Sequence, residues 1–170
     1  MLSEKLGKLL NDQIRKELFS AYFYLSMSAY FYDKSLDGMA NFFRVQAQEE
    51  RDHGMMIFDY IKETGGRVLL QKIDEPKHDF KSIVEVFKMA LDHERGVTKS
   101  IYNMVNVANE EKDHKTITFL RWFIDEQVEE ESTAESNLAK VKMMGDDGRG
   151  IFMIDQELLK RVYTPPIVSE

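Results

Sequence analysis

Two acidic stretches of the chain carry residue types that bind metal ions, and their spacing repeats. Glu50 and His53 are three residues apart, so on a helix both side chains project from one face. Gln127 and Glu130 repeat that spacing further along the chain. One glutamate stands 33 residues before each pair, and an offset of 77 residues relates the two sets. The sets are Glu17, Glu50 and His53 in the first half, and Glu94, Gln127 and Glu130 in the second.

This combination of residues is typical of a centre that binds two metal ions. A four-helix bundle that supplies one Glu from each of two helices, and a Glu-x-x-His pair from each of the others, builds a di-iron site. Oxygen-rich ligands with one imidazole suit Fe(II) and Fe(III), with Mn and Zn as competitors. We interpret Glu50 as the bridge between the ions. Glu17 and His53 then complete one site, and Glu94 and Glu130 complete the other.

Several neighbours extend the predicted centre. Gln127 stands where a carboxylate is expected, and its neutral side chain predicts a second ion that is held more weakly. Tyr24 lies seven residues after Glu17 on the same helix face, where it can donate an electron or a hydrogen bond. Trp122 is a further candidate for a redox-active aromatic residue. Three more carboxylates flank the ligands and are expected to bind a third cation: Glu49, Glu126 and Glu129.

Each of these residues also has a purely structural interpretation. Glu17 or Glu94 alone would more often form a salt bridge, and Gln127 alone would more often be a core amide. A run of glutamates is usually a solvated face, as we expect for Glu131. The matched offsets favour the metal site over these interpretations. Three histidines have no partner at matched spacing and are expected on the surface: His78, His93 and His114.

The candidate ligands lie on apolar faces of predicted helices. Prolines occur only at positions 76, 165 and 166, and four long windows between them show apolar steps of three and four residues. In each window the candidate ligand falls on the apolar seam, as Glu17 does between Ile14 and Tyr24. Carboxylates are seldom buried without a partner, so a bound cation would explain their position.

The connections predict one all-α domain over residues 1–170, with a four-helix bundle at about 3–143 and a short C-terminal helix at about 149–162. The turn at 33–38, with Asp37 as helix N-cap, makes the first two helices antiparallel. The third helix is expected to begin near Phe80. The connection before it spans up to about 50 Å if extended, and a helix of about 27 residues measures about 40 Å. Helices two and three are therefore predicted to be parallel, joined by a long crossover.

Composition narrows the functional classes. The 170 residues carry a net charge of -7, which argues against nucleic acid as a partner and favours cations. No cysteine is present, so thiolate metal sites and iron–sulfur clusters are excluded. The N-terminal residues lack an apolar signal core, and no apolar run of about 18 residues occurs. We expect a cytoplasmic protein without a membrane partner.

At this point the sequence resembles a non-haem ferritin of the bacterial and archaeal type, over nearly its whole length. A bacterioferritin would carry Glu and His where this chain has Gln127 and Glu130, and a rubrerythrin would add a cysteine-bearing iron module. The residues that carry the resemblance are Glu17, Tyr24, Glu49, Glu50, His53, Glu94, Glu126, Gln127, Glu129 and Glu130.

The resemblance implies that six of these positions form a ferroxidase centre: Glu17, Glu50, His53, Glu94, Gln127 and Glu130. It implies a third iron site at Glu49, Glu126 and Glu129 with Glu130, and it places Tyr24 beside the centre. It further implies a hollow homo-oligomeric shell, usually of 24 subunits, with the fifth helix around one set of axes. Fe(II) would enter through acidic pores and be oxidised by O2 or peroxide without haem, and the ferric ion would then mineralise inside.

Three other functions remain open from the sequence. A passive binder would sequester metal in a cage with a slow site, and turnover of many irons per subunit would exclude it. A di-metal oxidase or catalase-like bundle would have no storage cavity, and its native mass would reveal that. A plain structural bundle has no reason to place five ionisable residues on apolar seams.

Overall fold

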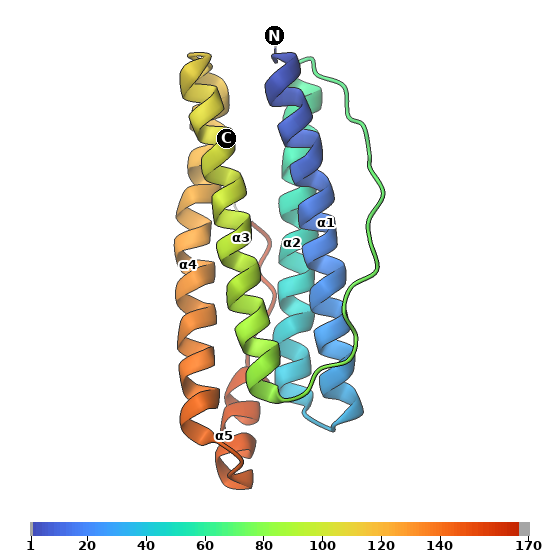
Figure 1. Cartoon of the computed structure of the whole chain (residues 1–170), viewed down its shortest axis with the longest axis vertical. Helices are drawn as coiled ribbons and strands as arrows, with labels where there is room; N and C mark the ends of the chain where they lie inside the picture. Colours follow the sequence, from blue (N-terminus) through green and yellow to red (C-terminus); the bar gives the residue numbers. More distant parts are fainter. Residues whose placement is uncertain (1, 167–170) are drawn as a thin grey trace.

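The computed structural model describes residues 2–166, which fold into a bundle of long helices with a short helix across one end (Figure 1). Position 1 and positions 167–170 of the predicted domain lie outside the described residues. The all-α fold with a short fifth helix is confirmed. The helices are α1 (Glu4–Asp33), α2 (Asp37–Glu63), α3 (Ile83–Glu110), α4 (His114–Met144) and α5 (Gly148–Leu158).

Side chains that cap the first turn explain where most of the helices begin. The hydroxyl of Ser3 accepts a hydrogen bond from the backbone N–H of Leu6 at the start of α1. Ser82 does the same for α3, and Asp113 does so for α4. Each of these oxygens satisfies a backbone donor that has no partner within the helix. The third helix therefore begins after Ser82, three residues later than the sequence predicted.

The N-terminus of helix α2 is capped by a side chain of α5. Asp37 was predicted to be its N-cap, but this prediction is wrong: Asp37 is already helical, and Leu36 precedes it without a side-chain cap. The carboxylate of Asp155, on α5, accepts the backbone N–H of Met39 at 2.9 Å instead. Asp37 still lies in the first turn, where its negative charge interacts favourably with the helix dipole.

The topology is the predicted one. Helices α1 and α2 form one antiparallel hairpin and α3 and α4 form the other (Figure 1). The crossover at 64–82 runs the length of α1, so α2 and α3 point the same way. Asn11 holds the crossover through the carbonyl of Arg67 at 3.0 Å and the N–H of Leu69 at 2.6 Å. Ser26 donates to the carbonyl of Lys77 at 2.8 Å further along.

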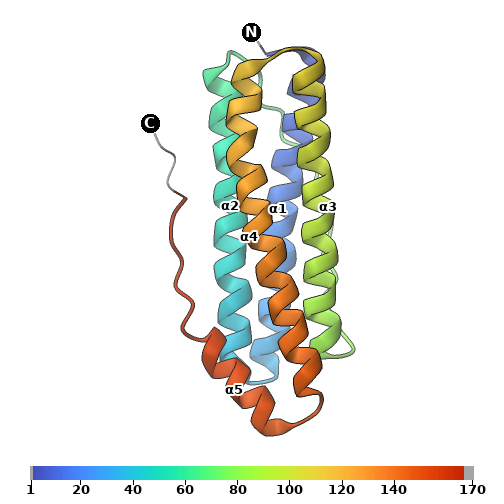
Figure 2. The same ribbon diagram turned by 90° about the vertical axis from the view of Figure 1, so that its left-hand side faces the viewer.

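The C-terminal helix is shorter than predicted. Helix α5 ends at Leu158, not near position 162, and the chain then turns back along α2 (Figure 2). The amide of Asn41 on α2 donates to carbonyl oxygens at the end of α5, which fixes this change of direction. Among residues 2–166, no helix is both long enough and apolar enough to span a membrane.

The buried apolar residues form two main clusters with a polar layer between them. The cluster near α5 contains Phe31, Phe43 and Phe87, and the cluster toward the other end contains Ile57 and Ile101. The candidate ligands occupy the positions between these clusters, in the middle of α1 to α4. Apolar layers on both sides exclude water and lower the local dielectric, which makes charge–charge interactions in the middle layer strong.

Candidate metal centre

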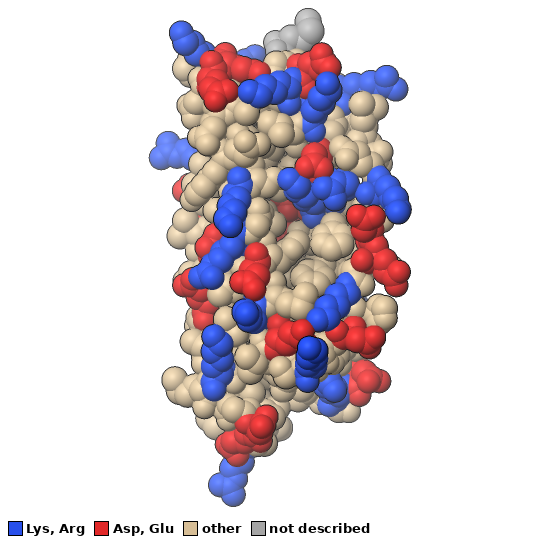
Figure 3. Space-filling model, viewed as in Figure 1, with Lys and Arg blue, Asp and Glu red and all other residues tan. Residues whose placement is uncertain are grey.

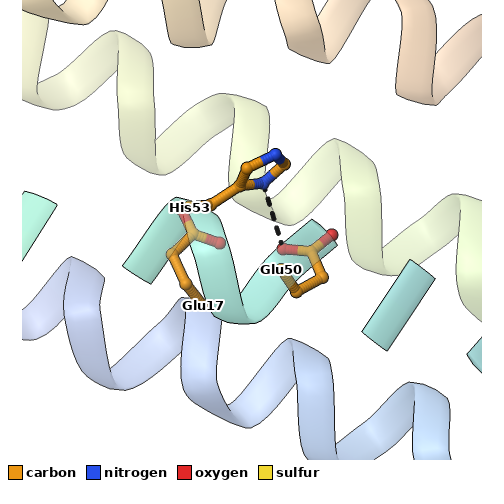
Figure 4. A group of neighbouring side chains, drawn as sticks. All are labelled: Glu17, Glu50 and His53. Carbon is orange, nitrogen blue, oxygen red and sulfur yellow. Dashed lines mark ion pairs between the residues drawn. The ribbon is translucent and has the colours of Figure 1, made fainter. Parts of the chain in front are cut away.

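Three of the predicted ligands converge in the middle of the α1–α2 hairpin (Figure 4). Glu17 on α1, and Glu50 and His53 on α2, each offer one donor atom within 4.8 Å of the others. His53 Nδ1 lies 3.6 Å from Glu50 Oε2. All three side chains are buried, at 1%, 2% and 4% exposure respectively. Since one Glu and a Glu-x-x-His pair meet here, the arrangement matches half of a di-metal carboxylate site.

The second half of the predicted ligand set lies on α3 and α4. Glu94 is 1% exposed and Glu130 is 6% exposed. Gln127 Nε2 lies 3.2 Å from three acceptors, the carboxylate and the backbone carbonyl of Glu94 and the hydroxyl of Thr98. Gln46 on α2 donates to Glu130 Oε2 at 2.8 Å. The four long helices therefore each contribute polar side chains to one buried layer.

Two buried oxygen atoms in this layer have no hydrogen-bond donor among the residues that the structure describes. Gln13 donates to Glu17 Oε1 at 2.9 Å, but Glu17 Oε2 is fully buried and has none. The carbonyl oxygen of Gln46 is also buried without a partner. An unpaired buried acceptor is costly, and a carboxylate oxygen of this kind is a suitable ligand for a hard cation. The donor set therefore fits iron or a similar divalent ion.

The pKa values of the buried carboxyl groups also indicate that a bound cation would stabilise the centre. Burial, followed by the neighbouring Glu94, Glu17 and Glu130, raises the pKa of Glu50 well above its ordinary value. Burial raises the pKa of Glu94 to about 7, although hydrogen bonds from Tyr24 and Gln127 oppose the rise. Burial and then Glu94 raise the pKa of Glu130 to about 8. Without a cation, these carboxyl groups hold protons at pH values where exposed glutamates are ionised.

Aromatic residues lie on both sides of the ligands. Tyr24 is 1% exposed, and its hydroxyl donates to Glu94 Oε1. Burial, together with Glu94 and Glu50, raises the pKa of the Tyr24 phenol well above its ordinary value. Trp122 packs edge-on against the His53 ring, with 5.3 Å between ring centroids. Both aromatic residues therefore touch a predicted ligand, as a redox or positioning role requires.

The three accessory carboxylates lie beside the centre in different environments. Glu49 and Glu126 are partly buried, and burial raises the pKa of both carboxyl groups. Repulsion from Glu126 adds to the rise at Glu49, and repulsion from Glu129 adds to the rise at Glu126. Glu129 is exposed. Glu49 also pairs with Arg161 of the C-terminal segment, whose Nη2 lies 2.6 Å from Glu49 Oε2. No pattern in the sequence indicates that contact.

Other polar residues near the centre carried little signal in the sequence. Gln13 contacts Glu17 on its own helix, whereas Gln46 on α2 and Thr98 on α3 contact ligands on α4. A lone polar residue on an apolar seam does not reveal such a partner. His93 was expected on the surface and is partly buried instead. Its Nε2 lies 2.7 Å from the hydroxyl of Ser20, and burial lowers its pKa to about 4. His78 and His114 are exposed as expected.

The helical topology and the mid-bundle layer of carboxylates, amides and one imidazole define a ferritin-like bundle. The family model described as a ferritin-like domain matches residues 7–144. A bacterial non-haem ferritin of Staphylococcus haemolyticus is 45% identical over 163 residues, covering 96% of this chain and 98% of that protein. One from Staphylococcus aureus is 44% identical over the same share of each chain. The chain belongs to the ferritin family.

Solved structures give the same result for the fold. An engineered closed form of the ferritin from Archaeoglobus fulgidus matches with a TM-score of 0.95 and 43% identity, covering 96% of this chain and 100% of that one. A humanized archaeal ferritin matches with a TM-score of 0.96 and 44% identity, covering 97% and 100%. The backbone of the whole bundle, including α5, is therefore that of a ferritin subunit.

Proposed function

We propose that this protein stores iron and oxidises Fe(II) to Fe(III) at a di-iron centre within each subunit. The observation that carries the proposal is the buried layer in which Glu17, Glu50 and His53 converge beside two further buried glutamates. Family membership supports storage and ferroxidase activity in general. The proposed ligands are Glu17, Glu50, His53, Glu94, Gln127 and Glu130, and the proposed third site uses Glu49, Glu126 and Glu129.

The buried carboxyl groups would give the centre its preference for cations. Fe(II) would bind Glu17 and His53 on one side and Glu94 and Glu130 on the other, with Glu50 between the two ions. Binding would displace the protons that burial retains on Glu50, Glu94 and Glu130. The attraction between the carboxylates and the ions then replaces the mutual repulsion of the carboxylates.

Two Fe(II) ions held together supply the electrons for the oxidation. Each ion gives one electron, so a pair reduces O2 to hydrogen peroxide with two protons, and peroxide can serve as oxidant in turn. The carboxylates stabilise the additional positive charge of Fe(III). The Tyr24 hydroxyl orients Glu94 on the α3 side of the centre. The protein's contribution is to bring both ions and the oxidant together in a water-excluded layer.

Storage further requires a closed assembly of subunits, which we propose to be a homo-oligomeric shell of 24 copies in the cytoplasm. Large apolar side chains exposed on the single subunit support this proposal. Tyr22 and Leu25 on α1 are 53% and 47% exposed, and Leu69 and Leu70 on the crossover are 51% and 69% exposed. On the face drawn in Figure 3, uncharged areas separate the acidic and basic side chains. Subunit contacts would cover such surface.

An aerobic Fe(II) titration of metal-free protein tests the proposal, followed by size exclusion with iron and protein detected together. We expect hundreds of ferric ions to co-elute with a particle far larger than one subunit. About two irons per subunit on a small particle would leave the centre intact and refute storage, as for a di-metal oxidase. Stoichiometric uptake without turnover would identify a passive binder, and no bound iron would refute both parts.

A further inference from the structure

The segment after α5 is bound to one face of α2. Gly38 permits the contact, because a Cβ atom there would lie 1.6 Å from the backbone oxygen of Asp155. One turn later, Asn41 Nδ2 donates to the carbonyl oxygens of Leu158, Leu159 and Arg161 at 3.4, 3.3 and 2.9 Å. The segment 159–166 then runs beside α2 toward the middle of the bundle (Figure 2).

This path places the side chain of Arg161 against the accessory carboxylates. The guanidinium lies over the Phe42 ring, 4.5 Å from its centroid, and donates from Nη2 to Glu49 Oε2 at 2.6 Å. The Arg161 and Glu49 side chains are only 24% and 17% exposed. Among residues 2–166, buried Arg161 Nη1 has no hydrogen-bond partner. One turn after Glu49 on α2, the carboxylate of Asp52 accepts a hydrogen bond from the Tyr163 hydroxyl. Asp52 directly precedes the proposed ligand His53.

The charge of Arg161 acts on more than one carboxylate. Burial raises the pKa of Glu49, Glu126 and Glu130, and attraction to Arg161 opposes the rise in each case. At Glu49 the guanidinium occupies the carboxylate oxygen that a cation bound there through Oε2 would use. It supplies one positive charge to a region that otherwise holds several buried acids.

A metal ion and the guanidinium cannot share the Oε2 atom of Glu49. A metal–carboxylate bond of about 2.0–2.2 Å, as for Zn, uses the same oxygen and brings two positive charges into contact. The contact between Nη2 and Glu49 Oε2 must break before that oxygen binds a metal ion. Since the pair is largely shielded from water, breaking it is costlier than for an exposed pair.

We propose that Arg161 is a built-in competitor for the third iron site, and that the segment 159–166 must release Glu49 before Glu49, Glu126 and Glu129 bind a cation. The proposal rests on the proposed function, because the third site is part of it. The competition would weaken and slow cation binding at the third site, and Arg161 would balance the negative charge of Glu49 in the metal-free protein.

Calorimetric titration with Zn(II) tests the competition without iron oxidation. The experiment compares the metal-free assembled wild type with Arg161→Gln and with Lys160→Gln, which removes an exposed charge one residue earlier. We expect the two main Zn(II) sites of each subunit to bind alike in all three proteins. The third site should tighten at least tenfold in Arg161→Gln and stay as in the wild type in Lys160→Gln.

A double-mutant cycle with Glu49→Gln completes the test. The gain from Arg161→Gln should disappear in the Glu49→Gln background, because the contested carboxylate is gone. A third site that is no tighter in Arg161→Gln than in the wild type, or a gain that persists with Glu49→Gln, would overturn the competition and leave the di-iron centre standing. Absence of the two main sites in every protein would instead refute the proposed function, and this inference with it.

Discussion

Glu130 is a buried carboxyl group that the metal-free protein protonates near neutral pH. Burial and then Glu94 raise its pKa from 4.5 to about 8, against the attraction of His53, the Gln46 hydrogen bond and the attraction of Arg161. Between these two pH values the folded protein binds a proton that the unfolded chain has released. The stability of the metal-free protein therefore falls as the pH rises from about 4.5 to about 8.

The substitution Glu130→Gln removes this penalty and keeps the shape of the side chain. The new amide oxygen can still accept the N–H of Gln46, which now reaches Glu130 at 2.8 Å. Each pKa unit corresponds to about 1.4 kcal/mol, so the full penalty is at most about 5 kcal/mol above pH 8. For a chain of this size we expect the variant to melt roughly 5–15 °C above the wild type at pH 9. At pH 5 the two should differ by only a degree or two.

Scanning calorimetry of chelator-treated protein between pH 5 and pH 9 measures this difference, with size exclusion to show the same assembly. Glu135→Gln is the matched control on α4, because Glu135 is exposed and pairs with Arg95 at the surface. The control should gain nothing at pH 9. An equal shift at both pH values, or a less stable Glu130→Gln protein at pH 9, would refute the claim that Glu130 is a costly buried acid.

Three further predictions test the centre and the end of the chain. Glu94→Ala should slow aerobic Fe(II) oxidation, measured by absorbance, at least tenfold and leave the assembly intact. Glu135→Ala should oxidise iron at the wild-type rate. Oxidation by Glu94→Ala at the wild-type rate would show that Glu94 is not part of the centre. Tyr24→Phe deletes a hydrogen bond that lowers the pKa of Glu94, so the pH at which Glu94 releases its proton in the metal-free protein should rise. Infrared difference spectroscopy of the carboxyl groups measures this, and an unchanged titration would contradict it. Gly38→Ala should destabilise the fold by about 1–3 kcal/mol and speed proteolysis after α5. Gly96→Ala, where an added Cβ meets no other atom, should do neither. Equal effects of the two substitutions would show that the close contact between Gly38 and α5 is unimportant.

The helices and the convergence of the ligands were predictable because both follow from periodicity. Apolar steps of three and four residues define which face of each helix is buried, so they also bring residues such as Glu17 and Glu94 into the core. The equal spacing of the ligands in the two hairpins also predicts that they lie at the same level along the bundle axis. Helix ends were less predictable, because a cap such as Asp155 on Met39 joins residues far apart in the sequence.

The environment of the accessory carboxylates could not be predicted for the same reason. The Arg161–Glu49 contact joins residues 112 positions apart and depends on where α5 ends. Asn41 determines that end through hydrogen bonds to three carbonyls, and no local pattern in the sequence reveals them. The partly buried His93 is a similar case, since its partner Ser20 lies on a different helix.

The two halves of the centre differ in how well their ligands are satisfied before metal binds. On the α1–α2 side, Glu17 keeps an unpaired buried oxygen, so a cation there gains a ligand without breaking a hydrogen bond. On the α3–α4 side, Glu94 already accepts from Tyr24 and Gln127, and Glu130 accepts from Gln46. An ion on that side has to compete with these donors. We therefore expect the α1–α2 side to fill first, and the second ion to be the labile one even apart from the missing charge at Gln127.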